Sequence, residues 1–138
     1  HPVNSEINPL SLIEYLDTKN KNICLPMVVN KKQPLIFKPW RPGKKMVIGH
    51  YGISVPDNDQ TLIPDLIICP LLAYDSKGMR LGYGGGFYDR TIKYLRRNKQ
   101  VKYIGLAFSG QKSYHDLPSE VHDVPLDAVL TEIGMENF

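Results

Sequence analysis

The chain has 138 residues, of which 42% are hydrophobic, and this length and composition predict one domain with a substantial core. The formal net charge of +3 comes from scattered basic residues rather than a dense stripe, which favours a polyanionic small-molecule ligand over nucleic acid. Two cysteines are too few for a disulfide scaffold, and no apolar run approaches the ~20 residues of a membrane span, so we expect a cytoplasmic protein without a membrane partner.

The first half of the chain predicts one helix, two strands and a long loop. Asn8 can cap a helix that has Pro9 at its first position. Residues 23–29 form an apolar, β-branched run that predicts a strand interrupted by a proline, and residues 35–38 predict a weaker strand. Residues 39–64 are rich in proline and glycine and predict mostly loop, and loops of this length inside compact domains tend to be functional.

The second half alternates strand and helix patterns. Residues 66–69 are the most hydrophobic stretch and show no alternation, as expected of a central strand buried on both faces. A glycine-rich loop follows, then a helical pattern over residues 87–97, and further strands over residues 103–108 and 128–130. This order predicts an α/β fold: a three-layer, open, mostly parallel sheet with helices on both faces, in a Rossmann-like layered domain that spans residues 1–138.

The loop between the central strand and the helix carries the clearest chemical signal. It reads Arg80-Leu81-Gly82-Tyr83-Gly84-Gly85-Gly86-Phe87-Tyr88-Asp89-Arg90. Bare backbone N–H groups at a helix N-terminus can face an anion, and arginines can donate charge-assisted hydrogen bonds to phosphate oxygens. The stretch fits neither the dinucleotide-binding pattern G-x-G-x-x-G, because Phe87 stands where a glycine is needed, nor a Walker-type loop, because no Gly-Lys-Ser/Thr follows. On the glycine pattern alone, phosphate binding and a structural turn both remain open.

The whole undecapeptide is more specific than its glycines. It resembles the signature R-L-G-x-G-x-G-[FY]-Y-D of the 5-formyltetrahydrofolate cyclo-ligase family, and residues 68–78 resemble that family's V-P-x-x-A-F-D-x-x-G run. The other matching segments, in chain order, are Glu6, Leu25-Pro26, Gly52-Ile53, Pro56, Gly105-Leu106-Ala107-Phe108, Gln111, Leu117-Pro118, His122-Asp123, Asp127 and Thr131-Glu132. The resemblance therefore covers nearly the whole chain.

The resemblance implies an enzyme, an ATP-dependent ligase that forms a C–N bond. In the family, phosphoryl transfer from ATP activates the formyl oxygen of 5-formyltetrahydrofolate, and N10 then closes the ring to give 5,10-methenyltetrahydrofolate, ADP and phosphate. Mg²⁺ between the ATP phosphates and protein carboxylates is the expected cofactor. The expected partners are therefore 5-formyltetrahydrofolate and ATP, and the protein is expected to be a monomer.

By the same resemblance, the family's site residues are carried over to positions of this chain. Catalysis is expected from Arg80, Tyr83 and Asp89, and magnesium binding from Asp89 and Asp123. The residues expected to hold ATP are Arg80, Leu81, Gly82, Tyr83, Gly84, Gly85, Gly86, Phe87 and Tyr88. The residues expected to hold the folate are Glu6, Tyr51, Tyr83, Gly84, Gly85, Gly86 and Phe87.

Several of these residues also have a purely structural interpretation. Asp89 could favour the first turn of a helix through the macrodipole, and Asp123 could cap a loop. Tyr51 could be a surface anchor, and Glu6 a solvated charge near a helix start. The histidines lack metal-ligand spacing and are expected at the surface or in loops.

Members of the family usually begin about fifty residues earlier, as estimated from the usual size of single domains, with a first strand and a helix whose basic residues reach the ATP. We therefore expect an N-terminally incomplete domain. The leading prediction is the cyclo-ligase, and the alternative is a catalytically weak folate- or nucleotide-binding remnant of the same family. A related enzyme acting on a sugar phosphate or a coenzyme A thioester is disfavoured by Glu6, Tyr51 and the complete glycine-loop signature.

Overall fold

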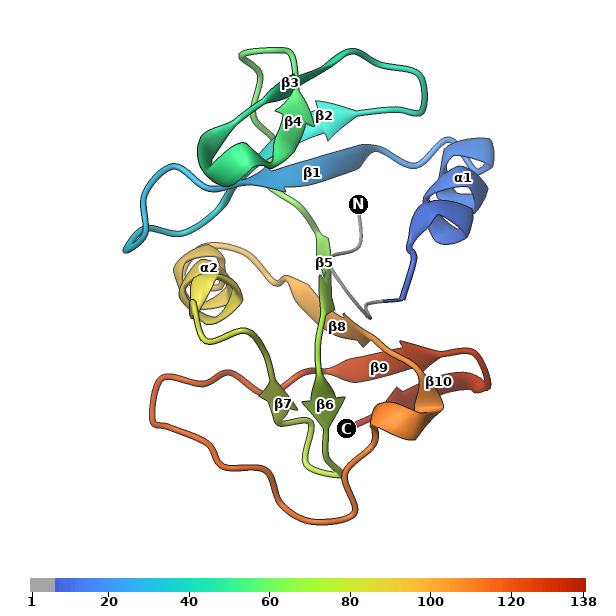
Figure 1. Ribbon diagram of the computed structural model, residues 1–138, viewed down its shortest axis with the longest axis vertical. Coiled ribbons are helices and arrows are strands. Elements are labelled where there is room, and N and C mark those ends of the chain that lie inside the picture. The colour runs from blue at the N-terminus through green and yellow to red at the C-terminus, as the bar shows by residue number, and fades with distance from the viewer. Residues whose placement is uncertain (1–6) are drawn as a thin grey trace.

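A computed structural model describes residues 7–138, which form an α/β fold with one four-stranded sheet and three two-stranded ribbons (Figure 1). The α-helices are α1 (Leu10–Thr18) and α2 (Phe87–Leu95). The strands are β1 (Ile23–Met27), β2 (Ile36–Trp40), β3 (Met46–Ile48), β4 (Ser54–Pro56), β5 (Leu66–Pro70), β6 (Ala73–Tyr74), β7 (Arg80–Leu81), β8 (Lys102–Leu106), β9 (Ala128–Thr131) and β10 (Gly134–Asn137). The ribbons β1–β2 and β3–β4 lie at one end of the molecule, and β6–β7, β9 and β10 lie toward the other (Figure 1).

The four-stranded sheet is mixed, with the strand order β10-β9-β8-β5. β5, β8 and β9 run parallel, and β10 returns antiparallel to β9. The predicted strand at residues 66–69 exists as β5, but it lies at the sheet edge among the described residues rather than at the centre. Its burial alternates, because Ile67 and Cys69 face the core while Leu66 is 42% exposed.

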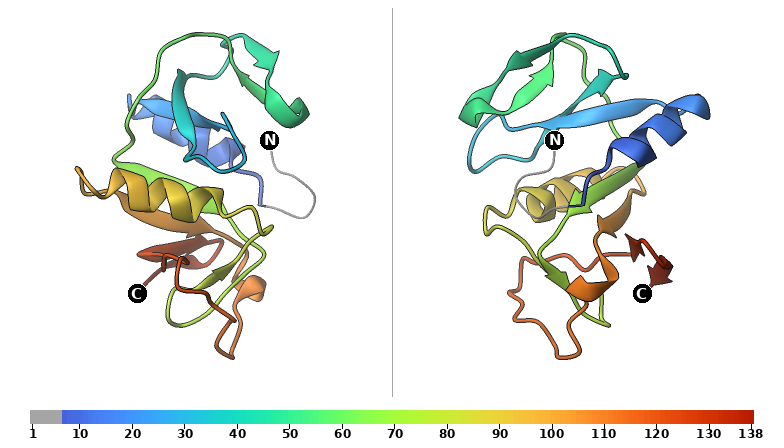
Figure 2. Two further views of the ribbon diagram at one scale, coloured as in Figure 1. Left: turned by 90° about the vertical axis from the view of Figure 1, so that its left-hand side faces the viewer. Right: turned by 45° about the vertical axis from the view of Figure 1, so that its right-hand side comes forward.

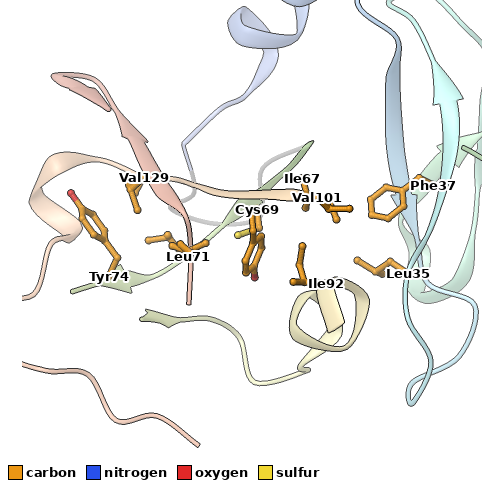
Figure 3. Packing of buried hydrophobic residues seen from close by; sticks show 12 residues of the cluster. Leu35, Phe37, Ile67, Cys69, Leu71, Tyr74, Ile92, Val101 and Val129 are labelled. Carbon is orange, nitrogen blue, oxygen red and sulfur yellow. The ribbon is translucent and has the colours of Figure 1, made fainter. Parts of the chain in front are cut away.

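Helix α2 packs on one face of this sheet and completes the main core. Figure 2 shows the helix lying across β5 and β8, and Thr91 and Ile92 are its buried residues. Thr91 also ties the helix to the N-terminal ribbon, because its Oγ1 accepts the N–H of Leu35 at 2.9 Å. One hydrophobic cluster therefore runs from Leu35 and Phe37 past Ile92 to Leu71, Tyr74 and Val129 (Figure 3).

Helix α1 begins at Leu10, one residue later than the sequence predicts. The Asn8 side chain accepts the N–H of Leu10 at 3.0 Å, and Pro9 occupies the position just before the helix. The helix packs beside β1 and buries none of its residues fully. The α/β class is therefore confirmed, but the predicted three-layer sheet with helices on both faces is not, because only α2 is seen to cover the four-stranded sheet among residues 7–138.

The predicted loop over residues 39–64 contains a second ribbon. β3 and β4 pair antiparallel from Met46 and Pro56 to Ile48 and Ser54, and a short 3-10 turn, His50–Gly52, lies between them. Each strand has three residues, β3 is followed by Gly49 and β4 ends on Pro56, so the pattern of turn residues hides the ribbon. The prediction of loop was wrong at these six positions and at Pro39 and Trp40, which belong to β2.

The structure describes both cysteines, Cys24 and Cys69, as free thiols, as the sequence predicts. Cys69 is fully buried. Within residues 7–138, no helix has the length and apolar character that crossing a membrane requires.

Candidate functional site

The glycine loop joins β7 to α2 and ends at the N-terminus of the helix. Gly84 has φ 87° and Gly86, the N-cap of α2, has φ 63°, both in the left-handed region that favours glycine. The first N–H groups of a helix have no acceptor inside it, and they carry the positive end of the helix dipole. The loop therefore has the geometry of an anion-binding helix start.

The guanidinium of Arg80 is fixed in a buried position beside this loop. Its Nε donates to the hydroxyl of Tyr103 at 2.6 Å, and its Nη2 donates to Oδ2 of Asp89 at 3.0 Å. The third nitrogen, Nη1, lies so close to Gly82 that a Cβ there would stand 2.6 Å from it. Only 10% of the Arg80 side chain is exposed. Arg80 thus faces the loop with one nitrogen and is anchored to the sheet and to α2 by the other two.

Two neutral groups lie on the sheet side of Arg80. Burial raises the pKa of the Tyr103 hydroxyl far above its ordinary value, so the phenol stays protonated. Burial also raises the pKa of the Cys69 thiol to about 11, which makes this cysteine an unreactive thiol at neutral pH. The charge of Arg80 is therefore balanced by Asp89 and not by the sheet.

The two predicted magnesium carboxylates lie on adjoining segments. Oδ1 of Asp89 accepts the N–H of Val124 at 3.0 Å, so the residue after Asp123 is bonded directly to α2. The Asp123 side chain accepts the N–H of Glu120 at 2.8 Å and so also caps its own loop. No cluster of three or more metal-ligating side chains exists among the described residues. Asp89 is the carboxylate beside the anion-binding loop, and one carboxylate together with substrate phosphates and water is a usual ligand set of Mg²⁺.

An apolar groove of about 650 Å³ opens beside the glycine loop. Its walls come from β1, from β4 with the preceding 3-10 turn, and from the start of α2. Of the residues predicted to hold the substrate, Tyr51, Gly85 and Phe87 line this groove, together with Tyr88 from the predicted ATP-binding set. The size lies in the range of about 300–1,000 Å³ that is typical of small-molecule sites.

A second hollow of about 930 Å³ lies at the far end of α2 and contains none of the predicted site residues. It is lined by residues 96–102 and Asp127, and two of its cations are already paired, Arg96 with Asp127 and Lys99 with Asp65. We therefore assign the ligand to the groove beside the glycine loop, although it is the smaller of the two.

Tyr51 is held in an unfavourable backbone conformation at the edge of the groove. Its φ of 61° and ψ of 22° lie in the left-handed region, which costs a residue other than glycine on the order of 1–3 kcal/mol. Its side chain is 58% exposed, and the Nζ of Lys31 lies 5.9 Å from the ring centroid. Such strain at an exposed aromatic residue in a groove favours a ligand contact over a surface anchor.

The other predicted residues lie nearby or outside the described chain. Tyr83 is 55% exposed on the loop, and Leu81 is 44% exposed on β7. Glu6 lies outside the residues that the structure describes.

Sequence reasoning did not single out three residues that the structure brings to the site. Met27 and Lys31 line the groove but carry no local motif that could have marked them. Tyr103 carried a signal, because a tyrosine hydroxyl in an otherwise apolar strand has to find a hydrogen-bond partner.

Comparisons with known proteins agree with the resemblance. The model of the "5-formyltetrahydrofolate cyclo-ligase family" matches residues 1–132. The 5-formyltetrahydrofolate cyclo-ligase of Haemophilus influenzae is 40% identical over 131 residues, which cover 91% of this chain and 69% of that protein. The protein of the same name from Escherichia coli K12 is 36% identical over 132 residues, which cover 91% of this chain and 71% of that protein.

Solved structures give the same family. The NMR structure of Aquifex aeolicus 5,10-methenyltetrahydrofolate synthetase matches with a TM-score of 0.76 and 28% identity over 99% of this chain and 68% of that chain. The 5,10-methenyltetrahydrofolate synthetase of Mycoplasma pneumoniae matches with a TM-score of 0.67 and 26% identity over 94% of this chain and 68% of that chain. Sequence family, named relatives and fold agree, and we conclude that the chain belongs to the 5-formyltetrahydrofolate cyclo-ligase family, a family of ligases.

Proposed function

We propose that this chain catalyses the ATP- and Mg²⁺-dependent cyclisation of 5-formyltetrahydrofolate to 5,10-methenyltetrahydrofolate, with release of ADP and phosphate. One observation carries the proposal: Gly85, Phe87 and Tyr88 belong both to the glycine loop with its helix start and to the wall of the apolar groove. A phosphate at the helix N-terminus and a flat ring in the groove would therefore be neighbours. That arrangement suits a reaction in which a phosphoryl group passes from a nucleotide to a folate.

The reaction has two steps. The formyl oxygen attacks the γ-phosphorus of ATP, and the bond from that phosphorus to the bridging oxygen breaks and releases ADP. N10 then attacks the phosphorylated formyl carbon and loses its proton, and the carbon–oxygen bond breaks as the oxygen leaves with phosphate. Phosphorylation is needed because an amide oxygen is a poor leaving group, and the protein contributes mainly positioning and charge stabilisation.

Four side chains and the backbone of the loop have roles in this scheme. The Nη1 of Arg80 and the backbone N–H groups of the loop and helix start bind the phosphate oxygens. Tyr83, exposed on the loop, contacts both substrates. Asp89 and Asp123 would hold Mg²⁺, which neutralises charge on the phosphates when bound.

The groove holds the folate. Tyr51 and Phe87 pack against the pterin ring from opposite segments of the chain. Glu6 accepts hydrogen bonds from the paired N–H donors of the pterin, as a carboxylate can.

We also propose that residues 1–138 act as one domain and as a monomer in the cytoplasm. The single hydrophobic cluster that joins the N-terminal ribbon to the sheet supports one domain. The free thiols of Cys24 and Cys69 fit a reducing compartment.

The test is the appearance of the methenyltetrahydrofolate absorbance band when the purified chain is mixed with 5-formyltetrahydrofolate, ATP and Mg²⁺. The variant Asp89→Ala should lose the signal, because it removes both the partner of Arg80 and a proposed metal ligand. Asp65→Ala is the matched control, since the Asp65 side chain is 89% exposed and pairs only with Lys99 among the described contacts. Binding of ATP and folate without the band would instead favour the non-catalytic binding remnant.

A further inference from the structure

A continuous series of buried polar groups runs beneath the glycine loop. It begins on β8, where the side chain of Tyr103 is fully buried. It continues from the Tyr103 hydroxyl to Nε of Arg80 at 2.6 Å, and from Nη2 of Arg80 to Asp89 at 3.0 Å. It ends where Asp89 accepts the N–H of Val124 at 3.0 Å. The series therefore connects the sheet, the start of the loop, helix α2 and the segment that carries the second proposed metal ligand.

Tyr103 contacts neither proposed substrate site. Its side chain is fully buried, and it does not line the groove. Its hydroxyl oxygen accepts the Nε–H of Arg80 at 2.6 Å. This hydrogen bond links Tyr103 to the loop through Arg80.

Because the guanidinium is planar and rigid, the hydrogen bond between Tyr103 and Arg80 Nε also determines where the other two nitrogens of Arg80 lie. The three nitrogens of Arg80 are fixed relative to one another, so a rotation that moves Nε away from Tyr103 also moves Nη1 away from Gly82 and Nη2 away from Asp89. Without the phenol oxygen, Nε would be a buried donor without an acceptor, which favours such a rotation.

We propose that Tyr103 is a positioning residue for nucleotide binding: its hydroxyl fixes the guanidinium of Arg80 so that Nη1 faces the glycine loop and Nη2 holds Asp89. The inference rests on the proposed function in one respect, namely that the loop binds the phosphates of ATP. It extends that proposal by naming a residue on β8, Tyr103, that holds Arg80 in place against the glycine loop.

Tyr103→Phe removes only the hydroxyl, and Tyr74→Phe is the matched control. Tyr74 is 2% exposed and belongs to the same hydrophobic cluster, but it lies at the end of the cluster away from Ile92 (Figure 3). We expect Tyr103→Phe to weaken binding of Mg·ATP about tenfold in calorimetry, the effect of one lost hydrogen bond to a charged group. The KM for ATP should rise with it, while the KM for 5-formyltetrahydrofolate should stay at the value of the unmodified protein. Equal losses for both substrates, or no difference from Tyr74→Phe, would overturn the proposal.

A double-mutant cycle with Arg80→Lys separates positioning from general packing. Lysine keeps the positive charge but has no Nε–H for the phenol to accept. We expect Tyr103→Phe to weaken Mg·ATP binding in the unmodified background and to add nothing in the Arg80→Lys background. Additive losses would contradict a role through Arg80.

A measurement on the unmodified protein covers the case in which Tyr103→Phe does not fold. The Nε–H resonance of Arg80 in ¹⁵N NMR should exchange slowly with water, both free and saturated with Mg·ATP, because its acceptor is buried. Fast exchange in the nucleotide complex would overturn the proposal.

The proposed function and this inference can fail separately. If the unmodified protein binds Mg·ATP but forms no methenyltetrahydrofolate, the catalytic proposal fails and the comparison of Mg·ATP affinities still decides the role of Tyr103. If the unmodified protein does not bind Mg·ATP at all, both are overturned.

Discussion

At the residue scale, two well-buried carboxylates stabilise the site and the adjoining turn, one through an ion pair and the other through backbone hydrogen bonds. Asp89, with a side chain 14% exposed, pairs with a guanidinium, whereas Asp75, 1% exposed, is surrounded by backbone donors. Oδ1 of Asp75 accepts the N–H groups of residues 77 and 79, and Oδ2 accepts that of Leu117 at 2.9 Å. Asp75 therefore closes the β6–β7 turn and attaches the exposed segment after residue 111 to it.

In the variant Asp75→Asn, the free energy of unfolding is expected to fall less steeply as the pH is lowered into the acid range. Burial alone would raise the pKa of Asp75, but the three backbone N–H donors outweigh burial and lower it. A lowered pKa in the folded state gives stability that is present above the unfolded value of about 3.9 and is lost as the pH falls through the folded value. The variant should lower the free energy of unfolding by about 1–3 kcal/mol at neutral pH, measured by urea denaturation.

The difference between the Asp75 variant and the unmodified protein should shrink below about pH 4. Asp116→Asn serves as the control, because Asp116 is 65% exposed and pairs with the exposed Lys77. A difference that stays constant down to about pH 2 would show that the ionised carboxylate is not what stabilises the turn.

At the scale of elements, the glycine loop depends on backbone conformation more than on space. A Cβ on Gly84 would meet nothing within 4 Å, yet its φ is 87°. Gly84→Ala should therefore destabilise the fold by roughly 1–2 kcal/mol through backbone strain, and it should weaken ATP binding because the loop relaxes away from its anion-binding form. Thermal unfolding and nucleotide calorimetry measure the two effects.

Gly110→Ala is the matched control for this prediction. A Cβ on Gly110 also meets nothing within 4 Å, and its φ lies outside the left-handed region. It should leave both stability and ATP affinity unchanged. If Gly84→Ala behaves like Gly110→Ala, the left-handed conformation of the loop is not needed for nucleotide binding.

The sequence predicts correctly those elements that are marked by a cap residue, by apolar spacing or by a continuous apolar run. α2 follows a glycine N-cap and has apolar spacing, and β5, β8 and β9 are compact apolar runs. The ribbons β3–β4 and β6–β7 were missed because their strands have only two or three residues, and β10 was missed because it contains no apolar run. Strands this short are stable only through their partners, so propensity and periodicity carry little information about them.

At the scale of the whole molecule, the groove depends on the packing of the N-terminal ribbons against α2. The hydrogen bond from Leu35 to Thr91 and the bond from Arg90 Nη2 to the carbonyl of Lys31 at 2.8 Å connect the two parts. Tyr51 and Phe87 line the same groove, so the groove draws on both of these parts. We therefore expect the affinity for folate to depend on the packing of the N-terminal ribbons against α2.

Tyr51→Gly is expected to separate stability from ligand binding. Glycine adopts φ 61° without strain, so the free energy of unfolding should change by less than about 1 kcal/mol. The ring proposed to contact the folate is lost, so the rise in melting temperature caused by 5-formyltetrahydrofolate should largely disappear, while the rise caused by ATP should persist. Thermal unfolding with each ligand measures both.

Tyr114→Gly provides the comparison for Tyr51→Gly, since Tyr114 is 91% exposed and lies outside the groove. Its ligand-induced shifts should match those of the unmodified protein. A normal folate-induced shift in Tyr51→Gly would remove Tyr51 from the substrate site.

Local sequence was sufficient for the glycine loop, the helix that follows it, the α/β class and the family, because each of these depends on neighbouring residues or on a contiguous motif. Three-dimensional packing was needed to show that Arg80 rests on Tyr103, that Tyr51 shares a groove with Phe87, and that β5 lies at the sheet edge. These contacts join residues 23 to 36 positions apart in the chain, or depend on strand order, and their free energies arise only when distant segments pack together. No local pattern of side chains encodes such contacts, which is why the site had to be assembled from the folded molecule.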